Sequence, residues 1–147
     1  MTPILSATVP GKPRPQGSMQ LSRDPRTGGE FAKYSQETVN HRNLAVGRLQ
    51  QAWAGNAALV GPVGVWCRFA FARPKAHFGT GRNAEVLKVG APAFMSSAPD
   101  TDKLLRLIGD ALTIAGVIAD DKLIVVMRGE KVYGERAETL VRVFDLV

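Results

Sequence analysis

Apolar and polar residues alternate most clearly in the middle of the chain, from residue 63 to residue 72. A period of two is typical of a strand with one buried face, so we predict a strand over this segment. Cys67 falls on the apolar side of the alternation and is expected to be buried. Shorter apolar runs predict further strands at residues 5–9, 123–127 and 138–147.

A helical period of apolar residues occurs twice. From Leu104 to Ala115 they recur at i, i+3, i+4, i+7, i+8 and i+11, which predicts a helix with one apolar stripe that Gly116 ends. A first helix is predicted from an N-cap at Ser35 to about Ala54. We expect His41 on the exposed face of this helix, and we expect its inner face to consist of Val39, Val46, Leu49 and Trp53.

The remaining segments lack either period. Prolines at positions 10, 13 and 15 exclude a helix and favour an extended chain. Residues 19–33 resemble a loop or a ragged hairpin with its tip at residues 26–29, and residues 73–99 form a long basic loop. The sequence therefore predicts one α+β domain over residues 1–147, with a mixed β-sheet packed against two main helices.

Charge is unevenly distributed along this basic chain, whose net charge is +6. Residues 1–99 carry twelve Lys/Arg and four Asp/Glu, a net charge of +8, whereas residues 100–147 carry seven and nine, a net charge of −2. This uneven charge suggests a basic binding surface around an acidic centre. A soluble basic protein without such a surface could have the same charge distribution. No apolar run is long enough to span a membrane, and the first 30 residues lack the apolar stretch of a signal peptide, so we expect a cytoplasmic protein.

The acidic centre consists of five aspartates in the last third of the chain. At about 100° per residue, Asp102, Arg106 and Asp110 share one edge of the second helix, opposite its apolar stripe. Asp100, as an N-cap, could turn towards the same edge, and Asp120 and Asp121 precede the next strand. Carboxylates in basic surroundings suit an enzyme that holds Mg²⁺ against a polyanion.

Each acidic residue also has an ordinary structural explanation. Asp100 could simply cap the helix, Asp102 could interact with the helix dipole, and Asp120-Asp121 could form a solvated turn. Asp102, Arg106 and Asp110 could form i,i+4 surface ion pairs. The residues alone leave these explanations open.

The order of these residues resembles the RusA family of Holliday junction resolvases. The resemblance is specific over residues 99–135, and it is carried by Pro99-Asp100-Thr101-Asp102-Lys103-Leu104-Leu105-Arg106, Asp110-Ala111-Leu112, Gly116, Asp120-Asp121 and Glu130-Lys131-Val132-Tyr133-Gly134-Glu135. The opening segment, Val9-Pro10-Gly11-Lys12-Pro13-Arg14-Pro15-Gln16-Gly17, is similar to that of the family but less specific.

The resemblance implies a homodimeric α+β endonuclease that cuts branched DNA with Mg²⁺ or Mn²⁺ and uses no small-molecule cofactor. It implies catalytic roles for Asp100, Asp102 and Asp121, with Asp120 as a further metal ligand. Arg106 stands where the best-known bacterial members have an essential lysine; an arginine keeps the charge but cannot act as a general acid or base. The DNA contacts that we expect are Lys12, Arg14, Arg73, Lys75, Arg82, Lys103 and Lys131.

Two other functions fit the same residues. One is a nuclease with a broader preference for forks or flaps, and the other is a non-catalytic protein that binds branched DNA. A dimer interface could come from an edge strand or from the apolar face of the first helix.

Overall fold

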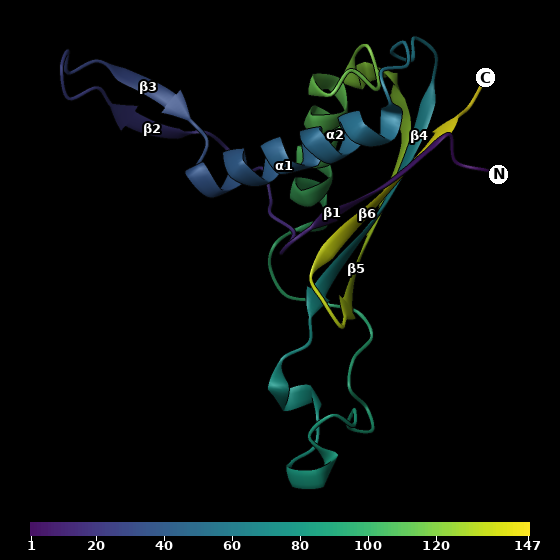
Figure 1. Cartoon of the computed structure of the whole chain (residues 1–147). Helices are drawn as coiled ribbons and strands as arrows, with labels where there is room; N and C mark the ends of the chain where they lie inside the picture. Colours follow the sequence, from purple (N-terminus) through teal and green to yellow (C-terminus); the bar gives the residue numbers. More distant parts are fainter.

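The computed structural model describes residues 1–147 and contains a four-stranded sheet with two long helices on one of its faces (Figure 1). The prediction of an α+β chain with a mixed sheet and two main helices is therefore confirmed. The helices are α1 (Gln36–Trp53) and α2 (Thr101–Ile114). The strands of the sheet are β1 (Leu5–Pro10), β4 (Val63–Ala72), β5 (Ile124–Gly134) and β6 (Glu138–Asp145).

The strand order is β1-β6-β4-β5, with β4 and β5 parallel and the other two pairs antiparallel. Parallel neighbours need a long crossover connection, and here it consists of residues 73–99 followed by α2. The acidic helix is therefore part of the connection between β4 and β5, whereas β1 and β5 form the two edges of the sheet.

The core lies between the sheet and the two helices. Its fully buried members include Phe69 of β4, Leu49 of α1 and Leu104 of α2. β4 has the predicted bounds, and Cys67 is completely buried within it, as predicted. Burial raises the pKa of the Cys67 thiol to about 12, so the thiol stays protonated and unreactive at neutral pH.

Helix α1 begins as predicted, because the Ser35 side chain accepts a hydrogen bond from the backbone N–H of Thr38. The prediction for His41 was wrong: the residue is only 8% exposed and lies on the buried side of α1. The buried face of α1 consists of Thr38, His41, Ala45, Leu49 and Trp53, which are spaced by three or four residues. Val39 and Val46 flank this face and are only partly buried.

A second, two-stranded sheet projects from the body of the molecule as an arm (Figure 1). It consists of β2 (Gln20–Arg23) and β3 (Glu30–Lys33), so of the two predictions for residues 19–33, a loop or a ragged hairpin, the hairpin is present. Leu21 and Phe31 on this arm are exposed.

Residues 73–99 extend beyond the sheet as the predicted long loop, interrupted only by two short 3-10 turns, η1 (Lys75–His77) and η2 (Gly81–Asn83). The far end of the loop is tied to β5: Met95 N–H donates to the carbonyl of Lys131, and Tyr133 N–H donates to that of Ala93. β5 is longer than the predicted strand 123–127, because it pairs with β4 as far as Gly134. Neither helix is long and apolar enough to cross a membrane.

Candidate active site along the acidic helix

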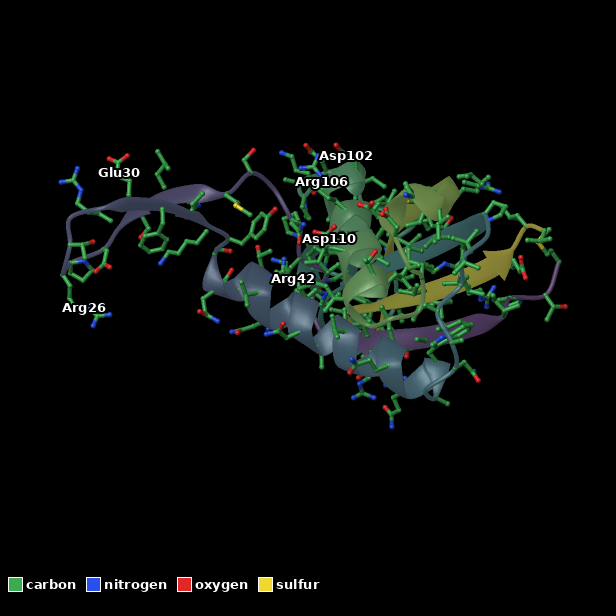
Figure 2. The ribbon with its side chains drawn as sticks, turned by 90° about the horizontal axis from the view of Figure 1, so that it is seen from above. Arg26, Glu30, Arg42, Asp102, Arg106 and Asp110 are labelled. Carbon is green, nitrogen blue, oxygen red and sulfur yellow. The ribbon has the colours of Figure 1, made fainter.

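Asp102, Arg106 and Asp110 lie along one edge of α2, as the helical period predicts (Figure 2). Asp102 and Arg106 are exposed, and neither takes part in an ion pair. The i,i+4 pairs that would have explained these residues as ordinary surface charges are therefore absent. A free carboxylate and a free guanidinium lie one turn apart on the same helix edge.

Asp100 is the N-cap residue of α2, with φ −70° and ψ 141°, but its side chain makes no capping hydrogen bond. The carboxylate instead forms an ion pair with Lys103, with 3.4 Å between Oδ2 and Nζ. The Asp100 side chain is 64% exposed. The explanation of Asp100 as a mere cap is therefore not supported, because the carboxylate is presented to solvent.

Asp120 and Asp121 lie in and next to the 3-10 turn η3 (Asp121–Leu123), directly before β5. Asp120 accepts a hydrogen bond of 2.9 Å from the backbone N–H of Lys122. This hydrogen bond, followed by the nearby Lys122 charge, lowers the pKa of Asp120. Asp120 therefore has a structural role in its turn, while Asp121 is exposed.

Two contacts show how α2 lies on β5. A Cβ at Gly109 would lie 3.7 Å from Ile124, at the start of β5, whereas one at Gly129, in the middle of β5, would lie 3.0 Å from Leu105 and 3.1 Å from Thr101. The helix thus runs antiparallel to β5, with its first turn packed closely on Gly129.

This arrangement separates the acidic residues into two groups. Asp100 and Asp102 are at the start of α2, while Asp121 is close in sequence to Ile124 and lies towards the later half of the helix. The helix rises about 1.5 Å per residue, so its two halves are on the order of 10 Å apart. No three His, Cys, Asp or Glu side chains come close enough within the chain to hold one metal ion.

Lys131 fixes the approach to this site. Its ammonium donates to the carbonyl of Ser97 at 2.6 Å and to that of Pro99 at 2.8 Å. These carbonyls belong to the segment that leads directly into Asp100. Lys131, which we expected to contact DNA, therefore holds the start of α2 on β5.

Gln16 connects the opening segment of the chain to both helices, a role that the sequence did not reveal. Its side-chain amide donates to the Asp110 carboxylate and accepts from Arg42 of α1 at 3.3 Å, and its backbone N–H donates to the Lys103 carbonyl. Gln16 is 1% exposed, and Figure 2 shows Arg42 beside Asp110. The guanidinium of Arg42 also lies over the Tyr34 ring at 5.5 Å.

The other expected DNA contacts fall into two groups. Arg14 pairs with Glu37 at 3.2 Å, and Arg73 donates to the Pro92 carbonyl at 2.7 Å, so both hold neighbouring segments in place. The second group consists of expected contacts whose side chains form no ion pair and no hydrogen bond: Lys12, Lys75 and Arg82. All three are exposed, which leaves their charges available to a polyanion.

The family model of the endodeoxyribonuclease RusA matches residues 10–144, which is nearly the whole chain. The chain belongs to the RusA family. No curated protein matches it at a significant level. Membership makes the chain an endodeoxyribonuclease of a junction-cleaving family, and the residues that carried the resemblance lie almost entirely within the matched range. The roles of the individual residues stay predictions.

Proposed function

We propose that this RusA-family chain is a Mg²⁺-dependent resolvase that cuts four-way DNA junctions by paired nicks at the edge of α2. The observation that carries the proposal is that the Asp102 carboxylate and the Arg106 guanidinium lie one turn apart on one exposed helix edge and form no ion pair. Exposed charges of both signs without partners suit a site that meets a cation and a phosphate together.

In this proposal Asp100 and Asp102 hold the metal and orient water at the start of α2, and Asp121, in the turn that Asp120 supports, supplies a carboxylate further along the helix. Carboxylate oxygens are the donors that Mg²⁺ prefers, and Mn²⁺ accepts the same set. Mg²⁺ usually takes only one or two protein carboxylates and completes its shell with water and substrate phosphate. Asp100 and Asp102 supply that number, so the proposed ion does not need Asp121 as a ligand at the same time. When bound, the ion would neutralise charge on the phosphate and lower the pKa of a bound water.

Arg106 binds the phosphate that is cut in this proposal. An arginine side chain stabilises negative charge but does not act as a general acid or base. The proton of the attacking water must therefore pass to a carboxylate or to solvent. We assign the backbone contacts to Lys12, Lys75 and Arg82, because no other side chain neutralises them.

A homodimer would supply the two nicks by symmetry, with one site for each strand. The apolar face of α1, which we considered as an interface, is used by the core of the chain itself: Leu49 is fully buried and Trp53 is 8% exposed. The proposal therefore places the interface at an edge of the sheet, along β1 or β5.

The test is cleavage of a labelled mobile four-way junction, compared with a fork of the same sequence at equal ionic strength, with Mg²⁺ or with EDTA. We expect symmetric paired nicks in the junction only with Mg²⁺, and a mass twice that of the chain at assay concentration. Faster cleavage of the fork would favour a broader branched-DNA nuclease. Binding without cleavage under every metal condition would refute the catalytic proposal.

A further inference from the structure

The face of the sheet that carries no helix has an aromatic and cationic centre. Trp66 of β4 lies on this face, since side chains alternate along a strand and its neighbour Cys67 points into the core. In the strand register, Trp66 lies between Arg142 of β6 and Arg128 of β5. Three adjacent strands thus place two arginines beside one tryptophan.

The ring of Trp66 is already in contact with cations. The guanidinium carbon of Arg142 lies 5.1 Å from the ring centroid, and that of Arg68 lies 5.5 Å from it. Arg68 is neutralised by Glu130 at 2.6 Å, whereas Arg128 and Arg142 form no ion pair. The centre of this face therefore carries two positive charges that nothing in the chain compensates.

A hollow of about 320 Å³ opens beside the ring. Its apolar floor includes Val126 and Phe144, and its polar lining consists of Arg128 and Arg142. An apolar, aromatic floor with cationic sides matches a nucleotide strand, whose bases have apolar faces and whose phosphates are anionic.

We propose that this open face binds an unpaired nucleotide strand, with a base stacked on Trp66 and phosphates paired with Arg128 and Arg142. Base stacking on an aromatic ring is stronger than an exposed cation–π contact. A base can therefore displace the guanidinium of Arg142 from the ring, and the displaced guanidinium then pairs with a phosphate of the same strand.

Charge complementarity favours nucleic acid over a second copy of this chain. A two-fold copy on this face would bring its own Arg128 and Arg142 against the same two arginines, and like charges in contact oppose association. The face is also on the opposite side of the sheet from α2 (Figure 1). An unpaired strand that emerges from the branch point would be held on this face, at a distance from the helix edge where the cut is made. The inference rests on DNA as the partner and not on the chemistry at α2.

Tryptophan fluorescence tests the proposal directly. The other tryptophan, Trp53, is 8% exposed on α1, so Trp53→Phe leaves Trp66 as the only reporter. Titration with oligothymidylate should quench this fluorescence at low salt, while a blunt duplex of the same length should quench it less. Trp66→Leu should weaken binding of oligothymidylate, measured by anisotropy of a labelled strand, about ten-fold or more.

The arginine contribution is measured by salt dependence, and it does not rely on the folding of the tryptophan variant. Arg128→Gln with Arg142→Gln should flatten the slope of log affinity against log salt by about 1.4 for a single strand, whereas the control Arg48→Gln, on the exposed side of α1, should leave it unchanged. An unchanged slope together with absent quenching would overturn the proposal. The proposal would also be overturned if the wild-type chain is a dimer and the Trp66→Leu variant is a monomer, because a second copy would then cover the face.

Cleavage of a fully paired four-way junction is scored in parallel. A chain that cuts junctions but does not bind oligothymidylate overturns only this inference. A chain that binds oligothymidylate but never cuts overturns only the proposed function.

Discussion

The two faces of the central sheet position their functional side chains in different ways. On the helix-covered face, the acidic edge of α2 depends on distant contacts: Gln16 holds Asp110, and Lys131 holds the segment before Asp100. On the open face, Trp66 and its arginines depend only on the register of neighbouring strands. Contacts on the covered face therefore both position the site and stabilise the fold, so a substitution there affects cleavage and stability together. Substitutions on the open face should alter binding with little effect on folding.

The largest effect that separates the two faces is expected from Asp102→Asn. It should abolish cleavage and leave junction binding intact or tighter, because it removes a metal ligand and reduces repulsion of phosphate. Gel-based cleavage and anisotropy on the same junction measure the two properties. Asp145→Asn, near the C-terminal end, serves as the matched control and should cut normally. Wild-type cleavage by Asp102→Asn would restore the helix-dipole explanation of this residue.

Gln16→Leu tests whether the covered face depends on its buried contacts. The change leaves the Asp110 carboxylate and the Arg42 guanidinium without their shared partner, which should lower the free energy of unfolding by about 1–3 kcal/mol. Urea denaturation measures this loss. Gln36→Leu removes an exposed amide that bonds only Asn40, and it should change stability by less than about 0.5 kcal/mol. Equal losses in the two variants would contradict a special role for Gln16.

The long loop belongs to neither face, and its charges are tested by Lys75→Gln with Arg82→Gln. Both side chains are exposed and free of ion pairs, so we expect the slope of log affinity against log salt on duplex arms to flatten by about 1.8. Adding Arg73→Gln should flatten it little further, because Arg73 bonds the Pro92 carbonyl. A slope that stays unchanged would identify Lys75 and Arg82 as solubilising charges.

The smallest effect concerns pH and the buried His41. Burial, followed by the nearby Arg14 charge, lowers the pKa of His41 below its ordinary value of 6.5. The unfolded chain then binds a proton more readily than the folded chain, so stability is complete above about pH 6.5 and falls as the pH drops below it. Urea midpoints at about pH 7.5 and 5.5 should show this loss in the wild type. The loss should be smaller in His41→Gln, and an equal loss would assign it to other groups.

Local periodicity was sufficient to predict most of the fold. The alternation around Cys67 gave β4, and the stripe from Leu104 gave α2, because each element buries one face and repeats its apolar residues at its own period. For α1 the same argument predicted the helix and placed Leu49 and Trp53 on its buried face, but it missed Thr38 and His41. A polar residue that is buried by tertiary packing leaves no mark in the local pattern.

The candidate site was predictable only where its residues are close in sequence. The edge formed by Asp102, Arg106 and Asp110 follows from helix geometry. The contact between Gln16 and Asp110 spans 94 positions, and Lys131 bonds carbonyls more than 30 positions away. Such contacts depend on how the crossover places α2 on β5, which no local pattern specifies.

The double attachment of the loop to β5 has a consequence for variation among related enzymes. Backbone bonds at residues 93 and 95 and the ammonium of Lys131 fasten the chain before it enters α2. Residues 73–92 can therefore lengthen, shorten or be exchanged without moving the carboxylates that follow. The loop is an exchangeable module: grafting it between relatives should transfer DNA preference while the catalytic chemistry stays with the recipient.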